Sequence, residues 1–233
     1  ALEVSSLKAL SSLANLDLDE IKIAKLGQKI EHEYIGTNCG IMDQFVSARA
    51  EFGEVLLIDC ESLNYKLLKF FPNYTFLIFH SGNKRKLSTS EYNSRKNETE
   101  IASNLLKVSS LRYANINQII NIKDKIIRKR AKHIISENQR VLDAVKELEE
   151  NNAINFGKLM YESHNSMAHD YEISSPELDS LVESAKVAGA TGARLTGAGF
   201  GGCVVMLVPK SNIEIISKSI LEKCPKSFFV SKL

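Results

Sequence analysis

The sequence has no tryptophan and only four cysteines and four prolines among its 233 residues. The cysteines are scattered without a C-x-x-C pair, which argues against both a disulfide framework and a cysteine zinc site. The five histidines form no metal motif either. On a helix, His164 and His169 would lie roughly 140° apart instead of sharing one face. We therefore expect reduced thiols, and structural or surface roles for the histidines.

Long apolar runs and a strong charge of either sign are also absent. The longest apolar runs, such as 54–60 and 203–209, are far shorter than the ~20 residues that span a bilayer, and no basic-then-apolar leader opens the sequence. The formal charge of +2 favours no particular partner. We expect a cytoplasmic protein with no membrane partner.

One basic run deserves separate treatment, because residues 123–133 hold six lysines or arginines and one aspartate. No aromatic residue lies within the run to stack on bases, and the run begins a segment with a helical apolar stripe. We interpret the basic residues as the solvated face of an amphipathic helix. We expect no nucleic-acid partner.

The apolar spacing predicts helices and strands without strict alternation. Helices are expected over 1–16, 20–35, 124–150, 153–168, 175–188 and 211–223. Strands are expected in a hairpin over 54–71 and in single segments over 74–82, 203–209 and 227–233. Pro72 marks a change of character between two parts of the chain. This mixture predicts an α+β fold, with domains at 1–70 and 71–233.

The stretch "LTGAGFGGC" (195–203) fits the spacing G-x-G-x-x-G at Gly197, Gly199 and Gly202. A dinucleotide site requires a strand before the glycines and a helix after them, because the helix N-terminus supplies the free N–H groups. Here a helix is expected before the loop and a strand after it. The sequence also lacks a "GK[ST]" element, so the P-loop interpretation fails, and a tight packed turn remains the plain alternative.

Three segments together resemble galactokinases, members of the GHMP small-molecule kinase superfamily. They are "NCGIMDQ" (38–44), "STSEYNSRK" (88–96) and "GARLTGAGFGGC" (192–203), in the family's order. The segments "RAKHIISENQRVLDAV" and "ESHNSMAHDYEISSPELDSLV" lie between the last two and are similar to galactokinases as well. The resemblance covers essentially the whole chain. It implies a two-domain GHMP kinase fold, with the remainder of the N-terminal domain at 1–70 and the C-terminal domain, an α/β sandwich rich in helix, at 71–233.

The resemblance also implies roles for individual residues. Asp43 matches the general base, for which a helix cap is the plain alternative, and Glu31 matches a Mg²⁺-binding carboxylate, for which an exposed surface acid is the alternative. Gly40 and Tyr92 match sugar contacts. Gly197 and Gly199 belong to the third motif, a turn that helps close the nucleotide site. One departure is that the family often has two arginines after this tyrosine, whereas Arg95 here is followed by Lys96.

The implied activity is ATP- and Mg²⁺-dependent phosphorylation of galactose at its anomeric hydroxyl. The 233 residues contain neither the family's first motif nor its "GxGLSSSA" phosphate loop, and "ALEV" matches the residues that follow that loop. We therefore expect this truncated chain to be inactive alone. Three alternatives stay open: a non-catalytic sugar-binding or partner-binding remnant, a kinase for a related sugar, and a chain completed by an N-terminal partner. Exposed apolar surface and self-association are expected with them.

Overall fold

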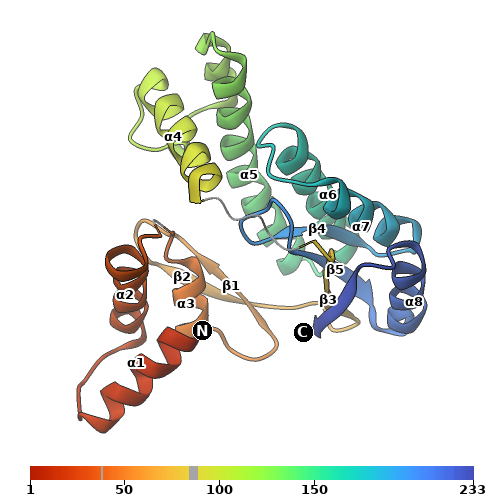
Figure 1. Cartoon of the computed structure of the whole chain (residues 1–233), viewed down its shortest axis with the longest axis horizontal. Helices are drawn as coiled ribbons and strands as arrows, with labels where there is room; N and C mark the ends of the chain where they lie inside the picture. Colours follow the sequence, from red (N-terminus) through yellow and green to blue (C-terminus); the bar gives the residue numbers. More distant parts are fainter. Residues whose placement is uncertain (38, 84–88) are drawn as a thin grey trace. The chain divides into compact units, whose positions relative to one another are not determined.

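A computed structural model describes residues 1–37, 39–83 and 89–233. The chain divides into two compact units, Ala1–Phe70 and Phe71–Leu233. The mixture of helices and small antiparallel sheets (Figure 1) is the expected α+β architecture, and that prediction is confirmed.

In its described residues, 1–37 and 39–70, the first unit contains three α-helices, a π-helical turn and a hairpin. They are α1 (Leu2–Leu13), α2 (Glu20–Ile30), the π-helical turn η1 (Glu31–Ile35), α3 (Met42–Arg49), β1 (Glu54–Ile58) and β2 (Tyr65–Lys69). Gly36 ends the helical segment in the left-handed conformation, with φ of 78°. The two strands pair antiparallel, from Glu54 opposite Lys69 to Ile58 opposite Tyr65, so the expected hairpin is confirmed.

The core of the first unit is small. Its buried apolar residues come from α1, α2, α3 and the residue before α3; they are Val4, Ile23, Ala24, Ile41, Phe45 and Ala48. Gly27 lets the helices approach, because a Cβ there would lie 3.2 Å from Gln44 and 3.5 Å from Glu3. Several leucines of α1 are exposed: Leu10 and Leu13 are 61% and 81% accessible.

The second unit carries a four-stranded sheet and five α-helices among its described residues. The strands are β3 (Tyr74–His80), β4 (Gly192–Thr196), β5 (Cys203–Pro209) and β6 (Phe228–Lys232). The helices are α4 (Thr89–Leu106), α5 (Lys125–Glu149), α6 (Ala153–His169), α7 (Pro176–Val187) and α8 (Ile213–Lys223), with short 3₁₀ turns between some of them.

The sheet has the order β4-β5-β3-β6, and every pairing is antiparallel. Alternate residues of its strands, such as Leu77, Leu195 and Met206, are fully buried against α6, α7 and α8. Figure 1 shows these helices together beside the sheet. The tight approach of α6 to β4 depends on Gly157 and Gly192, because a Cβ on Gly192 would lie 2.5 Å from the Gly157 Cα.

Helices α4 and α5 pack side by side through a separate cluster that includes Ala102, Ile127 and Ala131 (Figure 1). The interpretation of the basic run as a solvated face is wrong for Arg130, whose side chain is 2% exposed. Burial of that charge is possible because carboxylates from α4 and from the segment after α6 surround it.

The structure adds elements that the sequence pattern does not predict, namely α3, α4 and β4. Strand β4 lies between α7 and the glycine loop, so the expectation that a helix leads directly into that loop is wrong. The loop instead joins two antiparallel strands. None of the helices that the structure describes is long and apolar enough to cross a membrane.

Candidate functional site

In the first unit, the turn before α3 is held by side chains from α2 and η1. The Gln28 amide donates to the Cys39 carbonyl at 3.2 Å, and His32 Nε2 lies 2.8 Å from the same oxygen. The Gln44 amide lies 3.8 Å from the Cys39 sulfur. These contacts fix the chain at Cys39, directly before Gly40, which is exposed. Asn38 lies outside the described residues.

Asp43 occupies the first turn of α3, and its side chain is exposed. The helix-cap alternative is wrong, because the N-cap residue of this helix is Ile41 and Asp43 lies inside the helix. Asp43 therefore presents a carboxylate to solvent from a turn that is held in place by Gln28 and His32.

Glu31 lies where α2 passes into η1, and it is half-buried instead of being one more surface acid. Burial raises the pKa of the Glu31 carboxyl, and charge repulsion and hydrogen bonding from Glu3 of α1 raise it further. The two carboxyls are therefore neighbours from different helices. Paired carboxylate oxygens are hard donors of the kind that Mg²⁺ prefers, so the residues present fit the implied metal.

The structure contains no ready-made metal cluster in the parts it describes: no group of three or more His, Cys, Asp or Glu side chains converges there. Glu3 was not predicted from the sequence. It is 28 positions from Glu31, and only the packing of α1 on α2 brings the two together.

In the second unit, the glycine loop connects β4 to β5 through residues with left-handed backbone. Gly197, Gly199, Gly201 and Gly202 all have positive φ, and so does Phe200, with φ of 57°. A Cβ on Gly199 would lie 2.3 Å from the Ile173 carbonyl oxygen, so only glycine fits. The loop is thus a tight packed turn, as the plain alternative expected, and it has a fixed shape.

Hydrogen bonds from two other segments fix this loop. The Phe200 N–H donates to the Ile173 carbonyl at 2.7 Å, and the Ser81 N–H donates to the Gly202 carbonyl at 2.8 Å. A cavity of about 130 Å³ lies beside the loop, lined by Arg95, Tyr171, Ile173, Gly197, Ala198 and Phe200. The cavity is much smaller than a nucleotide, which fits a loop that borders a ligand site but does not enclose one.

The remaining predicted residues lie on α4. The backbone of Tyr92 belongs to that helix, but its side chain lies outside the described part of the structure. One turn later, Arg95 is 17% exposed and hydrogen-bonds the Tyr171 and Glu172 carbonyls, whereas Lys96 is exposed. The departure from a double arginine therefore falls on a surface position, and the arginine that makes the paired contacts is present.

The structure thus brings the predicted residues together in two groups. Glu31, Gly40 and Asp43 belong to the α1–α3 part of the first unit, and Gly197 and Gly199 belong to one loop of the second. Sequence reasoning missed Glu3, Gln28 and His32 in the first group, and Ile173 in the second. Ile173 lies in "ESHNSMAHDYEISSPELDSLV", and the resemblance of that segment to galactokinases is the signal that could have found it.

Two family models match the chain. The model for the GHMP kinases N terminal domain matches residues 1–51, and the model for the GHMP kinases C terminal matches residues 144–226. A galactokinase of Actinobacillus pleuropneumoniae is 43% identical over 97% of this chain and 61% of that protein, and one of Exiguobacterium sibiricum is 41% identical over 91% and 56%. The chain therefore spans about three fifths of the length of the curated relatives that it matches.

Solved structures are also similar to this chain. The structure of Lactococcus lactis galactokinase complexed with galactose superposes with a TM-score of 0.93 at 34% identity, over 98% of this chain and 63% of that one. The L. major mevalonate kinase in complex with R-mevalonate gives a TM-score of 0.67 at 21% identity, over 97% and 62%. The second likeness shows the fold alone.

Proposed function

Because the chain belongs to the galactokinase family of the GHMP kinases, we propose that it serves in the transfer of the γ-phosphoryl group of ATP to the anomeric hydroxyl of galactose. The observation that carries the proposal is the exposed Asp43 carboxylate on a turn anchored at the Cys39 carbonyl, within a chain similar to galactokinases over 97% of its length. Relatives and a solved structure named for galactokinase support the choice of sugar.

In this mechanism Asp43 is the general base. Its carboxylate accepts the proton of the anomeric hydroxyl, while the sugar oxygen forms a bond to the γ-phosphorus and the bond from that phosphorus to the ADP oxygen breaks. The proton ends on Asp43, and ADP leaves with the electron pair. An exposed carboxylate at a fixed turn can come within hydrogen-bond reach of a sugar, as a base must.

Glu31 would hold Mg²⁺, with Glu3 as its neighbour. When bound, the cation would offset charge on the β- and γ-phosphates. The proximity of the two carboxyls supports this assignment, because a divalent cation would relieve the repulsion that raises the pKa of Glu31. Gly40 and Tyr92 would contact the sugar, and Gly197 and Gly199 would border the phosphates.

We propose further that the two compact units correspond to the two domains of the family. Residues 1–70 would be part of the N-terminal domain, and residues 71–233 would be the C-terminal domain. The exposed leucines of α1 support an association with another chain, either a second copy or a separate N-terminal partner. Sedimentation of the wild-type chain and a Leu10→Glu variant tests this association.

The test of the activity is a galactose-dependent ADP-release assay on the purified 233-residue chain, with its intact mass recorded on the same sample. Asp43→Asn is the decisive variant, because it keeps the shape of the side chain and removes the base. Asp17→Asn is a matched control at an exposed position between α1 and α2. We expect any turnover to fall by at least about a hundredfold in Asp43→Asn and to stay unchanged in the control.

The outcomes separate the alternatives. Turnover that survives in Asp43→Asn would contradict the assignment of the base. Turnover of N-acetylgalactosamine but not galactose would favour the related-sugar alternative. The absence of turnover, with the correct mass, would support the expectation that these residues alone are inactive, and would leave a binding role or a completing partner as the function.

A further inference from the structure

We propose that Arg95, Glu98 and Arg130 position the glycine loop through the segment 170–173, and that Arg95 and Arg130 are positioning residues for the nucleotide side of the site. This rests on the proposed function in so far as the loop borders the phosphates. None of the three side chains belongs to the catalytic residues assigned above.

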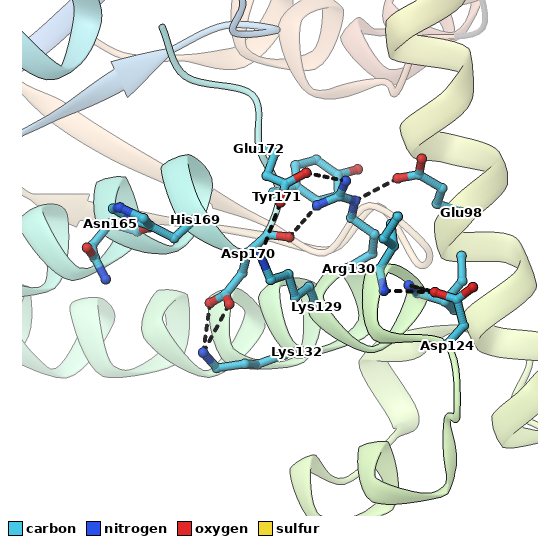
Figure 2. A network of polar contacts seen from close by, with 12 residues as sticks. Glu98, Asp124, Lys129, Arg130, Lys132, Asn165, His169, Asp170, Tyr171 and Glu172 are labelled. Carbon is cyan, nitrogen blue, oxygen red and sulfur yellow. Dashed lines mark hydrogen bonds and ion pairs between the residues drawn. The ribbon is translucent and has the colours of Figure 1, made fainter. Parts of the chain in front are cut away.

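The centre of the arrangement is the buried guanidinium of Arg130 (Figure 2). Its Nε donates to Glu98 of α4 at 2.6 Å, its Nη2 donates to Glu172 at 2.8 Å, and its Nη1 donates to the Asp170 carbonyl at 2.6 Å. Burial lowers the pKa of Arg130, but hydrogen bonds to Glu172 and Glu98 more than reverse this. A buried cation with each nitrogen paired is a rigid junction of three segments.

Arg95 makes the second connection, from α4 to the same segment. Its Nε donates to the Tyr171 carbonyl at 2.7 Å, and its Nη2 donates to the Glu172 carbonyl at 3.1 Å. Its Nη1 lies 3.3 Å from Glu98, which Arg130 also contacts. Two arginines therefore hold three consecutive carbonyls, those of residues 170–172. A planar guanidinium can do this because its donors have a fixed fork geometry.

Segment 170–173 contains a residue in an unfavourable backbone conformation. Glu172 has φ of 56°, which is unfavourable for a residue with a side chain. The hydrogen bonds to its carbonyl and carboxylate keep it in that conformation, and Lys129 adds a third contact at 3.1 Å. The next residue, Ile173, is thereby presented to the glycine loop.

The last step reaches the loop. Phe200 has φ of 57° and donates its N–H to Ile173, while Gly199 packs against the same carbonyl. The Arg95 guanidinium also lies 5.8 Å from the centre of the Phe200 ring. Glu172 and Phe200, two strained residues on separate segments, are thus coupled through Ile173. Arg95 contacts both of them from α4, the helix that also carries Tyr92. The loop needs this support because four of its residues are glycines.

The test is hydrogen–deuterium exchange of the 233-residue chain, measured without substrate so that its result does not depend on kinase activity. Arg95→Lys keeps the charge and removes the fork, and Arg130→Met removes the central cation. Arg140→Met is the matched control, because Arg140 also lies on α5 in a half-buried ion pair, with Glu137, and its hydrogen bonds go to Glu137 and Ser136 of the same helix. Global unfolding by urea is recorded for each variant.

We expect amides of 197–202 to exchange about tenfold faster or more in Arg95→Lys and Arg130→Met, the factor expected for loss of a charge-assisted hydrogen bond. The exchange rates of the β5 amides in both variants should match those of the wild type. The same is expected of all amides in the control variant. If Arg130→Met does not fold, Arg95→Lys decides alone. Loop exchange that stays at the wild-type rate in folded Arg95→Lys overturns the proposal, and so does an increase spread evenly over the whole second unit.

A kinetic readout separates positioning from general destabilisation wherever the chain turns over galactose. The KM for ATP should rise in Arg95→Lys, whereas Arg140→Met should change neither KM nor kcat. If the chain has no turnover, the exchange result alone decides the positioning role. The lack of turnover then bears only on the proposed kinase activity. The two failures are therefore distinguishable.

Discussion

At the scale of single residues, a substitution at Gly40 can distinguish a structural role of this glycine from a role in substrate binding. A Cβ built on Gly40 has no atom of a described residue within 4 Å, and its φ is not in the left-handed region, so the described part of the first unit has no steric need for glycine there. We therefore expect Gly40→Ala to change the free energy of unfolding by less than about 0.5 kcal/mol, as for ordinary surface changes.

The same substitution should weaken galactose binding if the sugar lies against this backbone. Calorimetric titration of galactose, or the KM for galactose where turnover exists, measures this effect. Gly53→Ala is the control: Gly53 has φ of 78°, so that variant should lose stability without an effect on the sugar. Unchanged galactose binding in a folded Gly40→Ala variant would remove Gly40 from the site.

His133 makes stability depend on pH. It is buried, lies 3.0 Å from the Ser166 hydroxyl and stacks on Tyr171. Burial, together with the charges of Arg140 and Arg194, lowers its pKa to about 4, although the charges of Glu137 and Asp170 act in the opposite direction. Because the folded pKa is below the unfolded one, the unfolded state binds the proton first as pH falls. Stability is therefore full above about pH 6.5 and declines toward pH 4.

We expect the protonation of His133 to lower the unfolding free energy by about 2 kcal/mol between pH 7 and pH 5. Buried His164, whose pKa burial also lowers, adds to the loss with the same sign. Urea unfolding at both pH values measures it. The slope should be shallower in His133→Gln and unchanged in His169→Gln, at an exposed position on α6. An equal slope in all three proteins would show that His133 is not the cause.

At the scale of elements, α5 begins where one side chain caps it. Asp124 Oδ1 accepts the N–H groups of Ile126 at 2.7 Å and Ile127 at 3.0 Å. Asp124→Ala should lower the unfolding free energy by about 1 kcal/mol. Asp124→Asn should retain most of that stability, because an amide oxygen can also accept the N–H groups at a helix N-terminus. Asp143→Ala in the middle of the same helix is the control. Equal losses in Asp124→Ala and Asp143→Ala would argue against the cap.

Helix α5 also shows why some elements were predictable. The sequence places this helix at 124–150, and it occupies Lys125–Glu149, because no glycine or proline interrupts a long apolar stripe. Two stripe members, Val141 and Leu142, are nevertheless 44% and 48% exposed. Periodicity therefore located the helix but overestimated its buried face, because burial depends on which neighbours are present.

The missed elements lack such a local signal. Helix α4 is mostly polar and is tied to its surroundings by Arg95 and Glu98, whose partners lie 32 to 77 positions further along the chain. Strand β4 has only five residues, and its pairing with β5 defines it. The same limit applied to the site: motifs identified Glu31 and Asp43, but Glu3 and Ile173 reach their positions only through tertiary packing.

At the scale of the whole molecule, the two units differ in how well they are packed. Among the residues that the structure describes, the main buried cluster of the second unit has sixteen members, whereas that of the first has six. The first unit also leaves Leu2 and Leu13 more than 80% exposed. A unit of seventy residues with so little buried apolar area is marginally stable, because burial must offset the entropy of ordering the chain.

We therefore expect two unfolding transitions, with the first unit losing structure at lower urea concentration. Phe45→Ala, at a position 1% exposed in the first core, should move only the early transition, and Phe79→Ala, at a fully buried position in the second, should move only the late one. Each loss should be about 3–5 kcal/mol. Hydrogen exchange assigned to 1–70 and 71–233 follows the two transitions separately. Both variants shifting one common transition would mean that the units unfold as a single cooperative body, so that the small core draws its stability from the larger one.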